Sequence, residues 1–182
     1  MILVSCSSPK DYNVKTVSVK EFKDFIDATG YITSAEEYGW SFVQENVYDY
    51  KVVNGANWIK PDGINNSFDS LPVTQVSYKD AIEYCKWADV RLPTYEEYWK
   101  FVASDNRIIV SNNIYPISDV KSVNIVGNVW DITETDNEDQ VRLAGGSLFC
   151  SIDTCHGTQK DRELYIDKET GNIHIGFSIL TE

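Results

Sequence analysis

Apolar side chains recur at helical spacing after a capping signal early in the chain. Ser18 begins a Ser-x-x-Glu capping box, and Phe22, Phe25 and Ile26 follow at positions i, i+3 and i+4. Gly30 suits the left-handed residue that ends a helix. The pattern predicts a helix between Ser18 and Gly30.

Two further segments carry the same combination of cap and apolar stripe. Ser77 opens the second helix, whose stripe includes Ala81 and Cys85. Thr94 caps the third, which carries Tyr98 on its apolar face. Because a buried thiol packs as a small hydrophobe, Cys85 is predicted to lie in the core.

The rest of the chain reads as short strands separated by clusters of Gly, Asn, Asp and Pro. Strands are predicted over residues 47–53, 73–76, 107–110, 141–149 and 173–180. Three helices and several short strands indicate an α+β fold with much irregular backbone. A length of 182 residues suits one domain, so we expect a flexible tail over residues 1–12 and a single folded domain over 13–182.

Charge and composition narrow the function. The chain has 16 basic and 28 acidic side chains, a formal net charge of −12, and 13% aromatic residues. The aromatic content supplies the large core side chains that disordered acidic chains lack. Strong acidity repels phosphate backbones and anionic lipids, so nucleic acid is not an expected partner. No apolar run approaches the roughly 20 residues that a membrane-spanning helix needs.

The N-terminal residues Leu3-Val4-Ser5-Cys6 resemble the end of a bacterial lipoprotein signal, although no basic segment and no full apolar segment precede them. This resemblance predicts a lipid anchor on Cys6 and a place in the bacterial cell envelope, as a periplasmic or outer-membrane lipoprotein. That compartment permits oxidised thiols. The alternative is that Cys6 is an ordinary thiol in a frayed terminus.

A first chemical candidate is the segment around Trp130. A hard cation such as Ca²⁺ takes several oxygen ligands, and Asn124, Gly127, Val129 and Asp131 offer an amide, two main-chain carbonyls and a carboxylate. The spacing by itself is weak evidence for such a site, and periodicity alone favours a turn that inserts Trp130 into the core. Both interpretations stay open at this point.

A second candidate is the stretch from Gly145-Gly146-Ser147 to a pair of cysteines, Cys150 and Cys155. Five residues of extended strand span roughly 16 Å, so the thiols meet only if residues 151–154 reverse direction. Two adjacent sulfurs can form a disulfide, bind a soft cation such as Cu(I), or act as a redox pair. The spacing does not choose among these.

The two histidines, His156 and His174, have no zinc-binding spacing, and we expect each to lie on the surface or to be hydrogen-bonded within the structure. The sequence has no nucleophile elbow, P-loop or dinucleotide fingerprint. Hydrolase, NTPase and Rossmann functions are therefore not expected.

Taken together, these motifs resemble one family, the formylglycine-generating enzymes or sulfatase-modifying factors. The matching segments occur in the family's order over most of the chain: residues 22–39, 41–43, 55–58, 72–77, 80–88, 91–94, 126–131, 145–147 and 176–177. The resemblance implies the C-type-lectin-like α+β fold of that family, with much irregular structure.

The resemblance also implies a chemistry. The family's paired active-site cysteines fall on Cys150 and Cys155, which would bind Cu(I), and the family serine falls on Ser147. With O2, such a site oxidises a cysteine of a protein or peptide substrate to formylglycine. Asn124, Gly127, Val129 and Asp131 match a family calcium site, in which Asp131 replaces the more usual Glu.

Several positions depart from the family pattern. Thr154 stands where a tyrosine is usual, His174 replaces an asparagine, and Ser178 replaces an arginine. Positioned polar groups hold a substrate while the metal reacts, so these losses affect substrate binding more than the fold.

Two functions are therefore weighed. The first is a copper-dependent oxidase of a protein cysteine. The alternative is a non-catalytic envelope lipoprotein that uses the same scaffold as a binding module, with Cys150 and Cys155 joined as a disulfide. A third, the iron-dependent sulfoxide synthases of the wider superfamily, needs a histidine-rich site, and two scattered histidines disfavour it.

Overall fold

The computed structural model describes residues 12–45, 49–102, 120, 126–149, 160–161 and 163–181. The elements in chain order are β1 (Asn13–Thr16), α1 (Val19–Thr29), α2 (Ser34–Tyr38), β2 (Trp40–Gln44), β3 (Tyr50–Asn54), α3 (Tyr78–Ala88), α4 (Tyr95–Val102), β4 (Trp130–Ile132), β5 (Gln140–Ala144), β6 (Tyr165–Asp167) and β7 (Ile175–Thr181). The predicted α+β fold is confirmed. The expected boundary between a tail of residues 1–12 and the domain stays a prediction.

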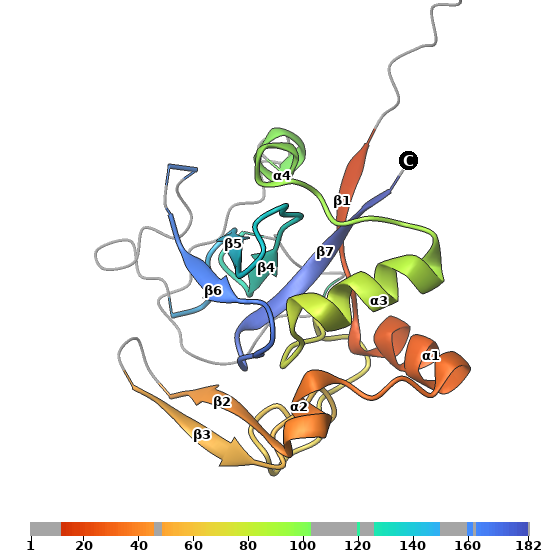
Figure 1. The fold of residues 1–182 in the computed structure, drawn as a ribbon, viewed down its shortest axis with the longest axis vertical. Coiled ribbons are helices and arrows are strands. Elements are labelled where there is room, and N and C mark those ends of the chain that lie inside the picture. The colour runs from red at the N-terminus through yellow and green to blue at the C-terminus, as the bar shows by residue number, and fades with distance from the viewer. Residues whose placement is uncertain are drawn as a thin grey trace, which may run out of the picture.

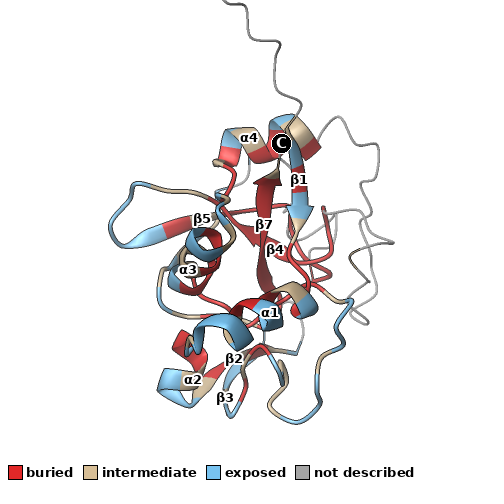
Figure 2. Cartoon of the chain, turned by 90° about the vertical axis from the view of Figure 1, so that its right-hand side faces the viewer, coloured by how far each residue is buried: buried red, intermediate tan, exposed pale blue. Residues whose placement is uncertain are grey.

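Five strands form the main sheet in the order β1-β7-β4-β5-β6, and β2 and β3 form a separate hairpin (Figure 1). The pair β4–β7 is parallel, and the other pairs are antiparallel. Strands β7 and β4 lie in the buried centre of the molecule, while the helices and the hairpin carry its exposed faces (Figure 2).

Helices α1 and α3 pack against this sheet through aromatic rings. The Phe177 ring of β7 lies 6.2 Å from the Phe22 ring of α1 and 5.3 Å from the Tyr84 ring of α3. All three rings are buried, and they join the helices to the central strand. Within the part of the chain that the structure describes, no helix is both long and apolar enough to cross a membrane.

The three helices expected from capping signals are confirmed. Ser18 and Ser77 each form the capping box that their spacing indicates, and α4 begins directly after Thr94. Cys85 is buried as predicted, and burial raises the pKa of its thiol to about 12, so it is inert at neutral pH.

The strand predictions succeeded less well. Residues 73–76 form no strand, because Gln75 adopts a left-handed conformation with φ 61°. The strand expected over 141–149 ends at Ala144, because Gly145 and Gly146 have φ 84° and 75°. The strand expected over 107–110 lies outside the described residues.

Gln75 joins the hairpin to the rest of the domain. Its side-chain amide donates to the carbonyls of Phe42 (3.0 Å) and Pro61 (2.6 Å), and its side-chain oxygen accepts from the Ser41 hydroxyl (2.5 Å). The residue is fully buried. These three bonds compensate for a backbone conformation that costs a non-glycine residue about 1–3 kcal/mol.

We expect the replacement Glu97→Gln to reduce the stability of the protein mainly above pH 4.5. The Glu97 carboxylate accepts two hydrogen bonds from Arg91 (both 2.6 Å) and one from the Thr94 amide, and these partners lower its pKa to about 2. Since the pKa is lowered in the folded state, the stabilisation is present above the unfolded-state pKa and is lost as the pH falls from about 4.5 towards 2.

Chemical denaturation at several pH values measures this effect. Glu97→Gln should lower the free energy of unfolding at pH 7 by about 1 kcal/mol or less, the range for partly exposed ion pairs, and the difference from wild type should shrink near pH 2. Glu96→Gln, a change at the neighbouring exposed carboxylate, is the matched control and should have little effect. A pH-independent difference for Glu97→Gln would contradict the assignment.

Candidate functional site

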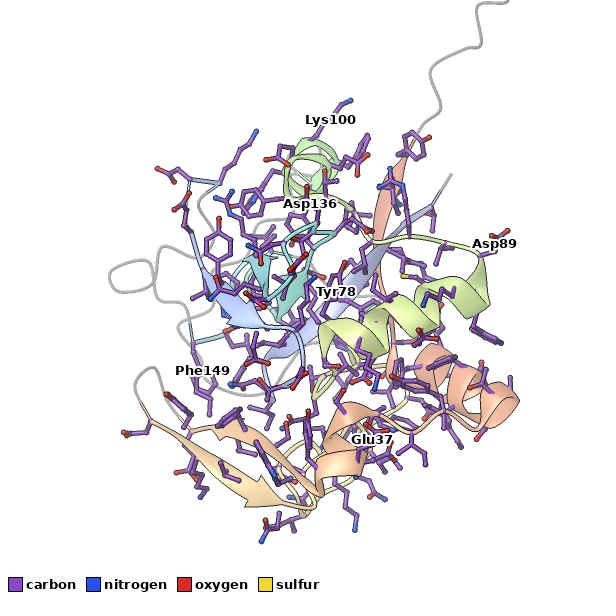
Figure 3. All side chains as sticks on the ribbon, viewed as in Figure 1. Glu37, Tyr78, Asp89, Lys100, Asp136 and Phe149 are labelled. Atoms are coloured by element: carbon purple, nitrogen blue, oxygen red, sulfur yellow. The ribbon has the colours of Figure 1, made fainter. Side chains whose placement is uncertain are left out.

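A cavity of about 560 Å³ lies between the β2–β3 hairpin and the main sheet. The hairpin contributes Phe42 and Tyr50, and strands β5 and β6 contribute Leu143 and Tyr165. Phe149, which also lines the cavity, is labelled in Figure 3 between the hairpin and the end of the sheet. Ligand sites commonly have this size and this concave form.

The end of β5 places Ser147 on the cavity wall. Gly145 and Gly146 both adopt positive φ, which only glycine tolerates without strain, and they turn the chain sharply after the strand. The Gly127 amide donates to the Gly145 carbonyl at 2.9 Å and fixes the turn. Ser147 is 2% exposed, and its hydroxyl accepts from the Phe149 amide at 3.3 Å. The serine chosen from the sequence therefore lines this cavity.

Cys150 and Cys155, the sequence-predicted copper ligands, lie outside the described residues. Their roles stay predictions. The chemistry of the donor set fits Cu(I), because two thiolates are soft ligands for a soft cation. Among the described residues, no group of three or more His, Cys, Asp or Glu side chains is arranged to hold a metal ion.

His174 is the functional candidate that the sequence analysis missed. The expectation of a surface or hydrogen-bonded histidine is wrong, because the side chain is 1% exposed and neither ring nitrogen has a hydrogen-bond partner within the described part of the chain. It lines the same cavity as Ser147. Burial lowers the pKa of the imidazole to about 3, so the ring is neutral at pH 7. The signal available in the sequence was the replacement of the family asparagine by histidine.

Asp131 occupies a buried position between β7 and α4. One carboxylate oxygen accepts from the Ser178 hydroxyl at 2.5 Å and the other from the Tyr98 hydroxyl at 3.0 Å. Burial raises the pKa of Asp131 to about 7, although the hydrogen bonds from Ser178 and Tyr98 oppose this rise. The carboxyl group therefore serves as an acceptor inside the core.

These residues fit a calcium ion incompletely. Ca²⁺ takes six to eight oxygen ligands, whereas both Asp131 oxygens already accept from hydroxyls, and Asn124 lies outside the described residues. Val129 is 1% exposed and Trp130 is 7% exposed, as expected for a turn that inserts Trp130 into the core.

An aromatic row leads along the hairpin to the cavity. The rings of Tyr38, Trp40, Phe42 and Tyr50 follow one another with centroid separations of 5.6, 5.5 and 5.8 Å. Trp40 and Phe42 alternate along β2 with the buried Ser41 and Val43, so the row lies on the opposite face of the strand, the face that borders the cavity. Phe42 and Tyr50 belong to both the row and the cavity wall.

Comparison with known proteins identifies the family to which the chain belongs. The family model of the sulfatase-modifying factor enzyme 1-like domain matches residues 11–122, well over half of the chain. The protein belongs to this family of formylglycine-generating enzymes.

Relatives within the family differ in activity. The mouse formylglycine-generating enzyme is 29% identical, with 77% of this chain and 57% of that protein covered. The enzyme of Thermomonospora curvata is 41% identical over 48% of this chain and 34% of its own length. The mouse inactive Cα-formylglycine-generating enzyme 2 is 35% identical over 59% of this chain and 40% of its own length. The chain thus spans between a third and somewhat over half of these relatives.

Solved structures share the fold at low sequence identity. PvdO from Pseudomonas aeruginosa superposes with a TM-score of 0.56 at 13% identity, covering 92% of this chain and 78% of PvdO. CarF superposes with a TM-score of 0.51, also at 13% identity, covering 92% of this chain and 83% of CarF. At such identity the likeness concerns the fold.

Proposed function

We propose that this protein oxidises a cysteine of a protein or peptide substrate to formylglycine. The observation that carries the proposal is the position of Ser147, which stands three residues before Cys150 and lines a cavity large enough for substrate side chains. Membership of a family that contains formylglycine-generating enzymes supports the same reaction.

Cys150 and Cys155 are proposed as the ligands of Cu(I). Two thiolates suit this ion in charge and softness, and a short turn over residues 151–154 would bring them together. When bound, copper(I) supplies the centre at which the substrate thiol meets O2. This assignment depends on the sequence motif that joins Ser147 to Cys150 and Cys155.

The overall reaction balances with dioxygen and an external thiol reductant. The carbon–sulfur bond of the substrate cysteine breaks, its sulfur leaves as hydrogen sulfide, and its β-carbon becomes an aldehyde. One oxygen atom enters the aldehyde and the other leaves as water, with two electrons and two protons supplied by the reductant.

The protein's own side chains contribute binding and orientation. The Ser147 hydroxyl can donate a hydrogen bond to an oxygen-bearing group in the cavity, because it accepts its bond from the Phe149 amide and keeps its proton for donation. Leu143, Trp130 and Phe149 line the same cavity, and apolar surroundings of this kind strengthen a hydrogen bond.

The proposal predicts aldehyde formation by the reduced, copper-loaded full chain. A set of cysteine-containing peptides, with a thiol reductant and O2, should yield a product detected by mass and by hydrazide labelling. Ser147→Ala should lower the rate by about tenfold to a hundredfold while leaving Cu(I) affinity unchanged, because the hydroxyl orients rather than binds the metal. Ser70→Ala, at an exposed serine, is the control. Absence of aldehyde from every peptide would sink the proposal.

A non-catalytic binding module is the second candidate. Its support is the similarity to relatives named inactive, together with the aromatic row of Tyr38, Trp40, Phe42 and Tyr50 at the cavity mouth. In that case Cys150 and Cys155 would form a disulfide. Thiol counting before and after reduction, followed by Cu(I) titration, separates the two candidates.

A place in the bacterial envelope, with a lipid on Cys6, completes the proposal and depends on the N-terminal motif alone. Metabolic labelling with a radioactive fatty acid measures the lipid on Cys6. The label should enter the wild-type protein and be absent from Cys6→Ser, and a wild-type protein without label would contradict the anchor.

A further inference from the structure

We infer that the cavity shared by Ser147 and His174 is a receptor for an aromatic side chain that bears an uncharged hydrogen-bonding group, with His174 as the buried partner of that group. If the protein is an oxidase as proposed, the aromatic side chain belongs to its substrate peptide, and to that extent the inference rests on the proposed function. A phenol is the simplest group of this kind.

The walls of the cavity favour an aromatic ligand. Four parts of the chain contribute aromatic side chains to its lining: the hairpin gives Phe42 and Tyr50, β4 gives Trp130, the loop after β5 gives Phe149, and β6 gives Tyr165. Aromatic rings pair with one another in edge-to-face or offset arrangements and gain about 0.5–1.5 kcal/mol beyond the area that they bury.

The charges of the cavity favour an uncharged ligand. The described lining residues include no Lys or Arg, so an anionic group finds no counter-ion among them. The one acidic side chain, Asp167, already accepts from the Thr170 hydroxyl at 2.7 Å and from the amides of Glu169 and Thr170, both at 2.8 Å. A charged group buried without a partner loses far more solvation than an uncharged one.

His174 supplies the unused hydrogen-bonding capacity. Its neutral imidazole carries one donor and one acceptor, and neither has a partner among the described residues. Its main chain is fully engaged, with the Trp130 amide donating to its carbonyl at 2.7 Å and its own amide donating to the Asn172 side chain at 3.3 Å. The backbone therefore holds the ring in place, while its polar atoms have no partner in the described part of the chain. A ligand with a hydroxyl group would supply one.

Phe149 controls access to the imidazole. Its ring lies 3.8 Å from the His174 ring, centroid to centroid, at an interplanar angle of 76°. Both ring nitrogens of His174 are buried, so a ligand reaches them only when the Phe149 side chain shifts. The aromatic ring of the ligand then replaces the Phe149 ring in the edge-to-face contact with the imidazole. The exposed Tyr50 and Tyr165, at 67% and 44% exposure, form the aromatic rim through which it passes.

Titration of the isotope-labelled, reduced and copper-free full chain with two small probes tests the inference. N-acetyl-tyrosinamide carries the phenol, and N-acetyl-phenylalaninamide lacks only the hydroxyl. Wild type should bind the tyrosine probe saturably and about tenfold more tightly, the expected value of one buried hydrogen bond. The nitrogen resonances of the His174 ring should shift with the tyrosine probe alone.

Variants of His174 complete the test. His174→Phe keeps a ring but removes both nitrogens, so the tyrosine probe should bind no better than the phenylalanine probe. His174→Asn keeps a donor and an acceptor and should retain most of the preference. Trp87→Phe, at an exposed ring of α3 that does not line the cavity, is the control. Equal binding of the two probes to wild type, an unmoved His174 ring signal, or no saturable binding would overturn the inference, whether or not His174→Phe folds.

The outcome is separable from that of the proposed function, because the probes contain no cysteine and the assay contains no copper. Aldehyde formation without a probe preference removes the aromatic receptor alone. A probe preference without aldehyde formation removes the oxidase alone and leaves a binding module.

Discussion

Replacement of Cys150 or Cys155 with serine should abolish both Cu(I) binding and aldehyde formation. A hydroxyl is a hard, weakly acidic ligand, and it cannot replace a thiolate towards a soft monovalent ion. We expect Cu(I) affinity to fall by at least about a hundredfold in each variant and product formation to fall below detection. The two cysteines are proposed to hold the ion together, so the loss of either one removes the site. Competition with a chromogenic Cu(I) chelator and product mass measure the two effects.

Cys85→Ala is the matched control for these variants. Cys85 is 4% exposed in α3 and does not line the cavity, so its loss should leave both Cu(I) affinity and product yield unchanged. Retained copper binding in the double variant Cys150→Ser/Cys155→Ser would remove the copper assignment. Retained copper binding in the wild type without any aldehyde product would instead leave a metal-binding relative of the inactive proteins.

Gly176→Ala should unfold the protein or destabilise it by about 3 kcal/mol or more. Gly176 lies in β7 opposite Asp131 of β4, and the backbone carbonyl of Val73 packs directly against its α-carbon. A methyl group placed there would collide with that carbonyl, and the Val129 side chain lies 3.6 Å away on the same side. Since the obstacle is main chain in a packed core, it cannot rotate away, and overpacking of this kind costs several kcal/mol.

Gly30→Ala separates this steric effect from the loss of glycine's backbone freedom. Gly30 ends α1 with φ 66°, and nothing lies within 4 Å of a methyl group placed on it. Its replacement should cost only about 1 kcal/mol, the penalty of a left-handed conformation. Denaturant unfolding of both variants gives the comparison. Similar losses for Gly176→Ala and Gly30→Ala would show that the close contact with Val73 carries no cost.

The elements found from the sequence are those that local interactions specify. Helices α1 and α3 each combine a capping box with an apolar stripe, so the residues that determine them lie within one segment. The short helix α2 carries the same signal in Thr33 and Glu36, whose side chains form a capping box. Its five residues are too few to present a repeated apolar stripe, so the pattern along the sequence does not reveal this helix.

Strand β4 and the bend at Gln75, neither of which was predicted, depend on distant partners. Strand β4 has three residues, all buried, so it shows no alternation, and it is a strand because β5 and β7 pair with it. Gln75 lies in a segment that reads as a strand, yet its side-chain bonds to Ser41, Phe42 and Pro61 stabilise a left-handed backbone. Neither outcome is encoded by neighbouring residues.

The sequence by itself determined the family, the capped helices, the buried Cys85, and the candidate motif of Ser147 with Cys150 and Cys155. These features depend on residue identities in order and on spacings of three or four positions. Only the tertiary structure decided that Ser147 and His174 share one cavity, that both carboxylate oxygens of Asp131 accept bonds from Ser178 and Tyr98, and that Gly176 has no room for a methyl group. The physical reason is that burial and unpaired hydrogen-bonding groups are properties of packed surroundings, and these surroundings come from segments far apart in the chain.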